Sequence, residues 1–136
     1  MFVLDTNVLS EVRQPKRSSP KVLAWASSQP IGAQFLSAIT ILELELGVSQ
    51  KERKDAAQGA VLRLWLDGKV LPQFAGRILP LDHAVALRCA RLHVPDPRAE
   101  RDAIIAATAL VHGMTIVTRN TADFAATGAP VFNPWE

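Results

Sequence analysis

Short apolar segments alternate with longer segments of helical pattern along the whole chain, and this alternation constrains the fold more than any other feature. The expected strands are residues 2–4, 35–39, 78–81, 115–118 and 130–132. Between them lie segments with helical spacing of apolar residues: 20–28, 43–47 and beyond, 55–66, a stretch after Asp82, and 102–112. Strands that alternate with helices predict an α/β fold, with a short, mostly parallel central sheet and helices on both of its faces.

Local signals set the expected boundaries of several elements. Thr40 and Glu43 form a T-x-x-E pattern, which predicts a capping box at the start of the second long helix. Gly68 follows the helical pattern of 55–66 and is expected to end that helix. Pro80 favours an edge position for the strand at 78–81. The segment 102–112 is apolar almost all round and precedes Gly113, which predicts a buried helix.

The chain of 136 residues fits one domain spanning 1–136, and its composition restricts where that domain works. No apolar run is long enough to span a membrane, and no basic segment precedes residues 2–4 as in a signal peptide. Cys89 is the single cysteine, which fits a reducing compartment. These features predict a cytoplasmic protein without membrane association.

A net charge of +2 is too small to indicate nucleic-acid binding by itself, but the basic residues are unevenly distributed. Arg13, Lys16, Arg17 and Lys21 form one basic run near the N-terminus. This run is either a solvated surface or a contact for an RNA backbone, and the charge pattern alone leaves both interpretations open.

Four acidic residues are expected at the same end of the sheet. Asp5 directly follows the first strand, Glu43 follows the second, and Asp123 comes shortly after the strand at 115–118. Asp102 opens a helix that should run antiparallel to its neighbouring strands, so that its N-terminus lies at their carboxyl ends. Ligand sites of such sheets lie beyond the carboxyl ends of the strands.

Each acid also has a purely structural interpretation. Asp5 fits a turn at a strand end, Glu43 the capping box, Asp102 a helix N-cap, and Asp123 a solvated loop. Together, however, clustered carboxylates repel one another by about 4 kcal/mol per pair at 4 Å and an effective dielectric of about 20. Such a cluster requires protons or a cation, and oxygen ligands favour Mg²⁺ or Mn²⁺. The three histidines show no metal-ligand spacing, and Cys89 fits a small core residue.

The acidic residues occur within segments that resemble the motifs of the PIN-domain nucleases, and of their VapC/FitB-like branch in particular. The similar segments follow one another in order across essentially the whole chain: 2–10 (FVLDTNVLS), 37–47 (SAITILELELG), 102–109 (DAIIAATA), 118–120 with 123–124, and 131–135 (VFNPW).

The resemblance implies a Mg²⁺- or Mn²⁺-dependent endoribonuclease that acts as the toxin of a bacterial type II toxin–antitoxin pair. It assigns Asp5 and Asp102 as direct metal ligands, with Glu43 and Asp123 completing the acidic site. Asn7 and Thr118 become supporting polar groups. A single-stranded or looped RNA is the expected substrate, because its backbone can enter a pocket that a duplex cannot.

The resemblance also implies a small antitoxin, whose tail covers the active site and presents a basic side chain to the carboxylates, and a homodimer. An apparent surplus of apolar residues in the segment 62–74 adds to the expectation of a dimer. These residues are not expected to face one core all together: Leu62, Trp65, Leu66, Leu71 and Phe74.

Two other functions compete with the nuclease. A phosphohydrolase with an aspartyl nucleophile fits the position of Asp5 after the first strand, although such enzymes usually carry a second Asp where this chain has Asn7. The other alternative is a non-catalytic module that binds nucleic acid or a partner with the same fold. The presence of all four acids argues against that module, and a metal titration would distinguish it.

Overall fold

The computed structural model describes residues 1–136 and contains one five-stranded sheet in which every strand is parallel to its neighbours. The strand order is β3-β2-β1-β4-β5. The strands are β1 (Phe2–Leu4), β2 (Gln34–Ser37), β3 (Ile78–Leu79), β4 (Thr115–Val117) and β5 (Val131–Phe132). The predicted α/β fold with a parallel sheet is therefore confirmed, and the proline-flanked β3 lies at an edge, as expected.

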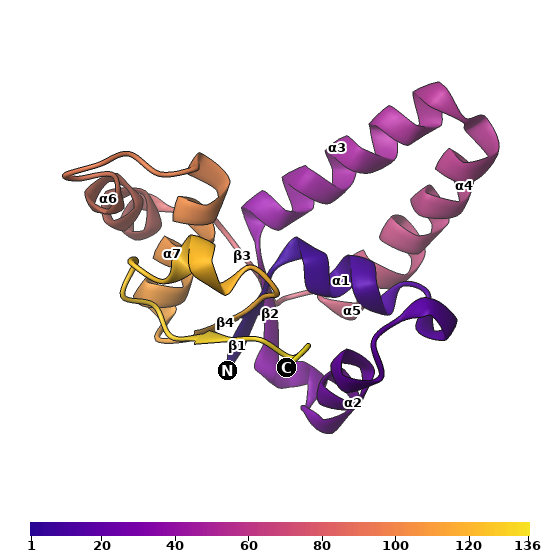
Figure 1. Cartoon of the computed structure of the whole chain (residues 1–136). Coiled ribbons are helices and arrows are strands. Elements are labelled where there is room, and N and C mark those ends of the chain that lie inside the picture. Colours follow the sequence, from indigo (N-terminus) through magenta and orange to yellow (C-terminus); the bar gives the residue numbers. More distant parts are fainter.

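Helices cover both faces of this sheet (Figure 1). They are α1 (Thr6–Val12), α2 (Pro20–Ser28), α3 (Ala38–Lys54), α4 (Ala56–Trp65), α5 (Leu71–Gln73), α6 (His83–Leu92) and α7 (Glu100–His112). Short 3₁₀ turns span Pro15–Arg17, Ile31–Ala33 and Thr121–Phe124, and a π-helical turn spans Leu66–Val70. None of the helices combines the length and the hydrophobicity that crossing a bilayer requires.

Alternation along the strands divides the core between the two faces. Leu4 of β1 and Val117 of β4 pack with apolar residues of α1, α2 and α3 in one cluster. Their neighbours Val3 and Ile116 point the other way and pack against α7 in a second cluster. Because successive side chains of a strand point to opposite faces, a strand buried on both sides must be apolar throughout. This explains why the strand segments lack polar alternation.

The second strand ends, and α3 begins, earlier than the sequence pattern predicts. Ser37 is the N-cap, and its hydroxyl accepts a hydrogen bond from the backbone N–H of Ile39 at 3.2 Å. The predicted capping box is wrong, because Thr40 already lies inside the helix and its buried hydroxyl has no hydrogen-bond partner. Glu43 consequently lies in the second turn of α3.

Gly68 does not end a helix, contrary to the sequence prediction. The chain continues from α4 through the π-helical turn, which contains Gly68, into α5. The apolar residues of this segment also share one core after all. Leu66 and Phe74 are fully enclosed, and Leu62, Trp65 and Leu71 pack against the same cluster. The apolar surplus inferred from the sequence therefore does not exist and gives no support to a dimer.

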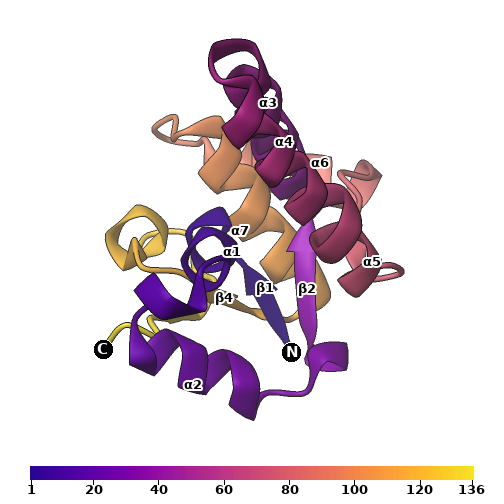
Figure 2. The ribbon, with the colours of Figure 1, turned by 90° about the vertical axis from the view of Figure 1, so that its right-hand side faces the viewer.

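Helices α3 and α4 form a hairpin that extends away from the sheet (Figures 1 and 2). Gly59 allows their backbones to approach closely, because a Cβ at this position would lie 2.4 Å from the Cα of Glu52. Arg63 of α4 donates hydrogen bonds to Glu45 and Glu52 of α3 at 2.7–3.3 Å. The hairpin thus holds α3 in place and, with it, the residue Glu43 near its start.

Candidate active site

The candidate active site lies where the direction of the strand order reverses. From β1, the chain continues to β2 and β3 on one side of the sheet, and it returns to β4 and β5 on the other. Open parallel sheets carry their ligand crevice at such a switch point, beyond the carboxyl ends of the strands. Asp5 directly follows β1 and Thr118 directly follows β4, so both residues stand at this crevice.

Asp5 is almost fully buried, with 8% of its surface exposed, and hydrogen bonds fix both of its carboxylate oxygens. It is the N-cap of α1, and its Oδ1 accepts a hydrogen bond from the backbone N–H of Thr6 at 2.8 Å. Its Oδ2 accepts hydrogen bonds from Thr118 Oγ1 at 2.8 Å and from Asn7 Nδ2 at 3.4 Å. Burial raises the pKa of Asp5, with a contribution from the charge of Asp123, and the Thr118 and Thr6 hydrogen bonds oppose the increase.

The two predicted supporting residues join the strand ends around Asp5. Asn7 Nδ2 donates to Thr118 Oγ1 at 3.2 Å, and Asn7 Oδ1 accepts a hydrogen bond from the backbone N–H of Arg119 at 3.4 Å. Thr118 Oγ1 also accepts from the backbone N–H of Asn120 at 3.0 Å. Asn7 and Thr118 therefore hold the loop after β4 against the start of α1.

A cavity of about 500 Å³ opens beside Asp5, and carboxylates from three different elements line it. Glu43 comes from α3 and Asp102 from the first turn of α7. Asp102 is not an N-cap, because Ala99 occupies that position and Asp102 is the third residue of the helix. It therefore caps no backbone group with its side chain, and its carboxylate is available to the cavity.

Burial, and after it the charges of the neighbouring carboxylates, raises the pKa of the acidic residues at the cavity. Burial raises the pKa of Glu43, the charge of Asp5 raises it further, and Arg101 opposes this effect. Burial also raises the pKa of Asp102, with added contributions from the charges of Asp123 and Asp5. Asp123 is exposed in the 3₁₀ turn after β4, where it does not line the cavity but acts on Asp5 and Asp102 through its charge.

The structure adds cavity residues that the sequence analysis did not identify. Thr6, Ser10 and Glu11 come from α1, which the apolar pattern did not predict as a helix. The spacing of Asn7, Ser10 and Glu11 at i, i+3 and i+4 is a signal that could have revealed this polar helix face.

The basic residues at the cavity also differ from those of the expected basic run. Arg101 Nη1 lies 3.9 Å from Glu43 Oε2, and Arg119 lines the cavity while its guanidinium lies 5.5 Å from the centre of the Trp135 ring. In contrast, Arg13 and Arg17 line a separate cavity at the far end of α1, and Lys16 lies beside it.

By its fold and its site, this chain is an α/β protein with an acidic cavity at the switch point of a parallel sheet. The chain belongs to the PIN-domain family, because the family model described as "PIN domain" matches residues 2–130.

Relatives and solved structures similar to this chain cover its full length. "VapC ribonuclease Y4jK" of Sinorhizobium fredii is 39% identical over 143 residues, which covers 100% of this chain and 99% of the relative. The crystal structure of FitAcB from Neisseria gonorrhoeae is 41% identical with a TM-score of 0.91, covering 100% of this chain and 99% of that chain. A toxin-antitoxin complex from Klebsiella pneumoniae is 26% identical with a TM-score of 0.69, again with 100% and 99% coverage. These similarities place the chain in the VapC/FitB-like branch of the family.

Proposed function

We propose that residues 1–136 form a divalent-cation-dependent endoribonuclease domain, which is the toxin of a bacterial toxin–antitoxin pair and acts in the cytoplasm. The proposal rests mainly on three carboxylates that line one cavity: Asp5, which follows β1, Glu43 of α3 and Asp102 of α7. Its support is the 39% identity, over the whole chain, to a protein named a VapC ribonuclease. Its free, buried Cys89 fits a reducing compartment.

The residues at the cavity fit a hard divalent cation such as Mg²⁺ or Mn²⁺. Its candidate ligands are carboxylate oxygens, which these ions prefer, and no sulfur or imidazole nitrogen lines the cavity. Burial, together with the charges of neighbouring carboxylates, raises the pKa of Asp5, Glu43 and Asp102, and a bound cation would offset both effects. Thr6 Oγ1, which faces Glu43, is buried without a hydrogen-bond partner of good geometry, so a polar partner is missing there.

In this proposal Asp5 and Asp102 hold the cation, and Glu43 and Asp123 complete the acidic site. When bound, the cation supplies Lewis acidity, which acidifies water and offsets negative charge on the phosphate. The hydrogen bonds from Thr118 and Asn7 keep the Asp5 carboxylate in one orientation.

Glu43 and the two arginines of the cavity have complementary roles in cleavage. A Glu43 Oε atom accepts a proton from the attacking water, a role that suits a carboxylate with a raised pKa. Arg101 and Arg119 contact the phosphate, which would otherwise be repelled by the acidic cavity. Arg13, Lys16 and Arg17 lie beyond the cavity, and there they contact the RNA backbone farther along the strand.

The aspartyl-nucleophile alternative is disfavoured by the surroundings of Asp5. Both of its oxygens accept hydrogen bonds from groups that hold them in place, and its surface is almost fully covered. A nucleophile needs an oxygen that can reach the phosphorus atom. The hydrogen bonds around Asp5 therefore suit a ligand better than a nucleophile.

The proposed partners are a small antitoxin and a second copy of the chain. The α3–α4 hairpin exposes four apolar side chains that the core does not cover: Leu42, Leu46, Val61 and Leu64. A helix of a partner with an apolar face would cover them, and a basic side chain of the antitoxin tail would face the carboxylates. Charge-removing substitutions at Asp5 and Asp102 should weaken binding of such a tail, and light scattering at tens of micromolar should show a dimer.

The nuclease proposal is tested by replacing Asp5 with asparagine and measuring cleavage of single-stranded RNA. We expect Asp5→Asn to lower the cleavage rate at least about 100-fold, the scale of losing one group that stabilises charge in the transition state. The matched control is Asp55→Asn, which removes the same charge at the N-cap of α4, outside the cavity. Cleavage by folded, cation-saturated Asp5→Asn at the rate of the control would remove Asp5 from the mechanism.

A further inference from the structure

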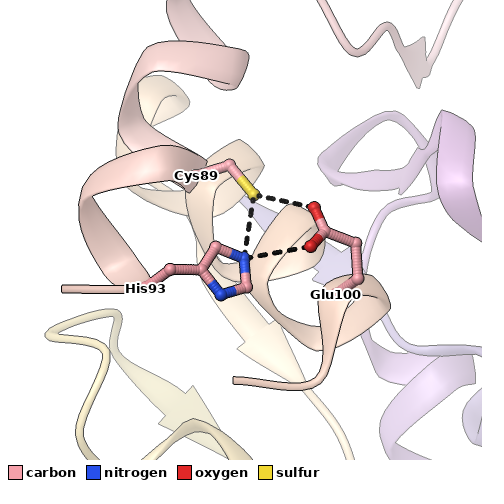
Figure 3. Close-up of side chains that lie close together, drawn as sticks. All are labelled: Cys89, His93 and Glu100. Carbon is pink, nitrogen blue, oxygen red and sulfur yellow. Dashed lines mark hydrogen bonds and ion pairs between the residues drawn. The ribbon is translucent and has the colours of Figure 1, made fainter. Parts of the chain in front are cut away.

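Away from the acidic cavity, a cluster of potential metal ligands lies where α6 ends and α7 begins (Figure 3). Cys89 Sγ lies 4.0 Å from His93 Nε2 and 3.8 Å from Glu100 Oε1. His93 Nε2 lies 3.2 Å from Glu100 Oε2. These three residues, together with Ile104 and other residues of the two helices, line a cavity of about 330 Å³ that is separate from the acidic one.

Helix geometry and helix packing bring the three side chains together. Cys89 and His93 are four residues apart at the end of α6, so they share one helix face. Glu100 is the first residue of α7, and α6 and α7 pack through a shared apolar cluster that contains Val85 and Ala107. The histidines show no metal-ligand spacing in the sequence, because the third group, Glu100, comes from the next helix.

We propose that Cys89, His93 and Glu100 bind a borderline-soft divalent cation of the Zn²⁺ class, with one coordination position left open. A thiolate, an imidazole and a carboxylate are ligands that Zn²⁺ accepts in proteins, whereas Mg²⁺ takes oxygen alone. In a tetrahedral site with bonds of about 2.0–2.3 Å, ligand atoms lie about 3.3–3.6 Å apart. The observed separations of 3.2–4.0 Å are close to that geometry before any cation is bound.

The burial of the three groups fits an open site. The thiol of Cys89 is buried, the His93 side chain is 21% exposed, and the Glu100 side chain is 70% exposed. The buried ligands fix the position of the cation, and the exposed carboxylate leaves a path for it from solvent. Burial and the Glu100 carboxylate raise the pKa of the Cys89 thiol, so a cation that binds this sulfur must displace its proton.

The proton balance of binding predicts a local structural change. His93 Nδ1 now accepts a hydrogen bond from the backbone N–H of Arg98 at 3.1 Å, so Nε2 carries the imidazole proton. To ligate through Nε2, the neutral imidazole must carry its proton on Nδ1 instead, and the thiol releases its proton to water. The Arg98 amide then loses its acceptor, while the Arg98 guanidinium can keep its hydrogen bonds to the carbonyl oxygens of Leu92 and Ala126.

The cation would tie the end of α6 to the first turn of α7, which also carries Arg101 and Asp102. Asp102 of this turn lines the acidic cavity, and Arg101 Nη1 lies 3.9 Å from Glu43 Oε2. The site is thus a structural link that holds the first turn of α7 in position. It does not depend on the nuclease proposal, because its ligands do not line the acidic cavity.

The test is a Co²⁺ titration of the full chain after treatment with a chelator. Wild type should develop a thiolate-to-cobalt charge-transfer band and tetrahedral d–d bands at one equivalent, and Zn²⁺ should abolish them. Cys89→Ser should lose the charge-transfer band, and His93→Gln and Glu100→Gln should weaken Co²⁺ binding at least about tenfold. His112→Gln, which removes an exposed histidine at the end of α7, is the matched control and should bind like wild type.

Further measurements distinguish this site from the acidic cavity and detect the structural effect of cation binding. Asp5→Asn should retain the cobalt bands, which separates this site from the acidic one. Zn²⁺ should speed hydrogen exchange of the Arg98 amide and raise the melting temperature in wild type but not in folded Cys89→Ser. A charge-transfer band that is absent in wild type, or that persists at full affinity in both His93→Gln and Glu100→Gln, would overturn the proposal.

Discussion

Replacing Asp102 with asparagine should stabilise the cation-free protein at neutral pH, although it removes a proposed ligand. Two unit charges about 6 Å apart repel by roughly 3 kcal/mol at an effective dielectric of about 20. Solvent and salt reduce this to about 1 kcal/mol for each pair in an open cavity. The charge of Asp102 acts together with those of Asp5 and Asp123, so its removal relieves about 2 kcal/mol.

The position of Asp102 in α7 opposes this gain only in part. A carboxylate in the first turn of a helix contributes about 0.3–1 kcal/mol through the helix dipole. The net stabilisation is therefore about 1 kcal/mol, which corresponds to an increase of about 3–5 °C in the melting temperature of a domain of this size. With saturating Mn²⁺, wild type should melt at a higher temperature than Asp102→Asn. Each tenfold loss of Mn²⁺ affinity removes about 1.4 kcal/mol of the stabilisation that the bound cation provides.

The pH dependence of stability follows from the same carboxylates. The pKa values of Asp5, Glu43 and Asp102 are raised above their ordinary values of 3.8, 4.5 and 3.8. The folded state therefore binds more protons than the unfolded state, and this contribution to stability is fully present below about pH 4. It is lost as the pH rises through the folded pKa values. The cation-free protein should accordingly gain less from Asp102→Asn at about pH 5 than at about pH 8.

The assay is thermal unfolding of wild type, Asp102→Asn and the control Asp55→Asn, with EDTA and with millimolar Mn²⁺, at both pH values. Asparagine caps a helix about as well as aspartate, so Asp55→Asn should change little under any condition. Suppose instead that, with EDTA, Asp102→Asn melts at a lower temperature than wild type, and that Mn²⁺ raises the melting temperature of both proteins equally. Asp102 would then be only a residue that favours the helix N-terminus, and the reasoning about repulsion would be refuted.

Two further substitutions test the packing and the hydrogen bonds that position the site. Gly59→Ala should destabilise the fold by about 1–3 kcal/mol, because the new Cβ would lie 2.4 Å from the backbone of Glu52. A Cβ at Gly47 in α3 meets no atom within 4 Å, so Gly47→Ala should stabilise the fold by about 0.5–1 kcal/mol. Equal effects of the two substitutions in denaturant unfolding would refute the close approach of Gly59 to Glu52. Thr118→Val should destabilise the fold by about 1–3 kcal/mol and raise the pKa of Asp5, because the buried carboxylate loses a donor. An unchanged Asp5 pKa in an NMR titration of Thr118→Val would contradict that role.

The sequence was sufficient to predict the sheet and the places where the acids meet it. Apolar strands such as Phe2–Leu4 carry a strong signal because both faces of a parallel sheet are buried. Asp5 and Glu43 could be placed from this signal, because residues that follow parallel strands lie at the carboxyl edge of the sheet. The family motifs added Asn7 and Thr118. The local capping rule misjudged the position of Glu43, which lies in the second turn of α3.

Elements whose boundaries depend on tertiary contacts could not be predicted. Ser37 and Thr40 both precede helical residues, and it is the pairing of Leu36 and Ser37 with β3 that extends the strand to Ser37, after which the helix begins. The π-helical turn around Gly68 persists because Leu66 and Val70 on either side are buried. Similarly, no spacing rule brings Glu100 to His93, since that contact depends on how α7 packs against α6.

Whether the acidic cavity holds a cation that RNA cleavage requires is tested by measuring Mn²⁺ binding and RNA cleavage in the same samples of wild type and single variants. A Cys89→Ser background removes the second proposed cation site from the titration without touching the acidic cavity. We expect cleavage to rise with Mn²⁺ occupancy and to stop in EDTA, and we expect Asp5→Asn and Asp102→Asn to lose Mn²⁺ binding and cleavage together. RNA cleavage that continues at an undiminished rate in excess EDTA would contradict a cation held by these carboxylates.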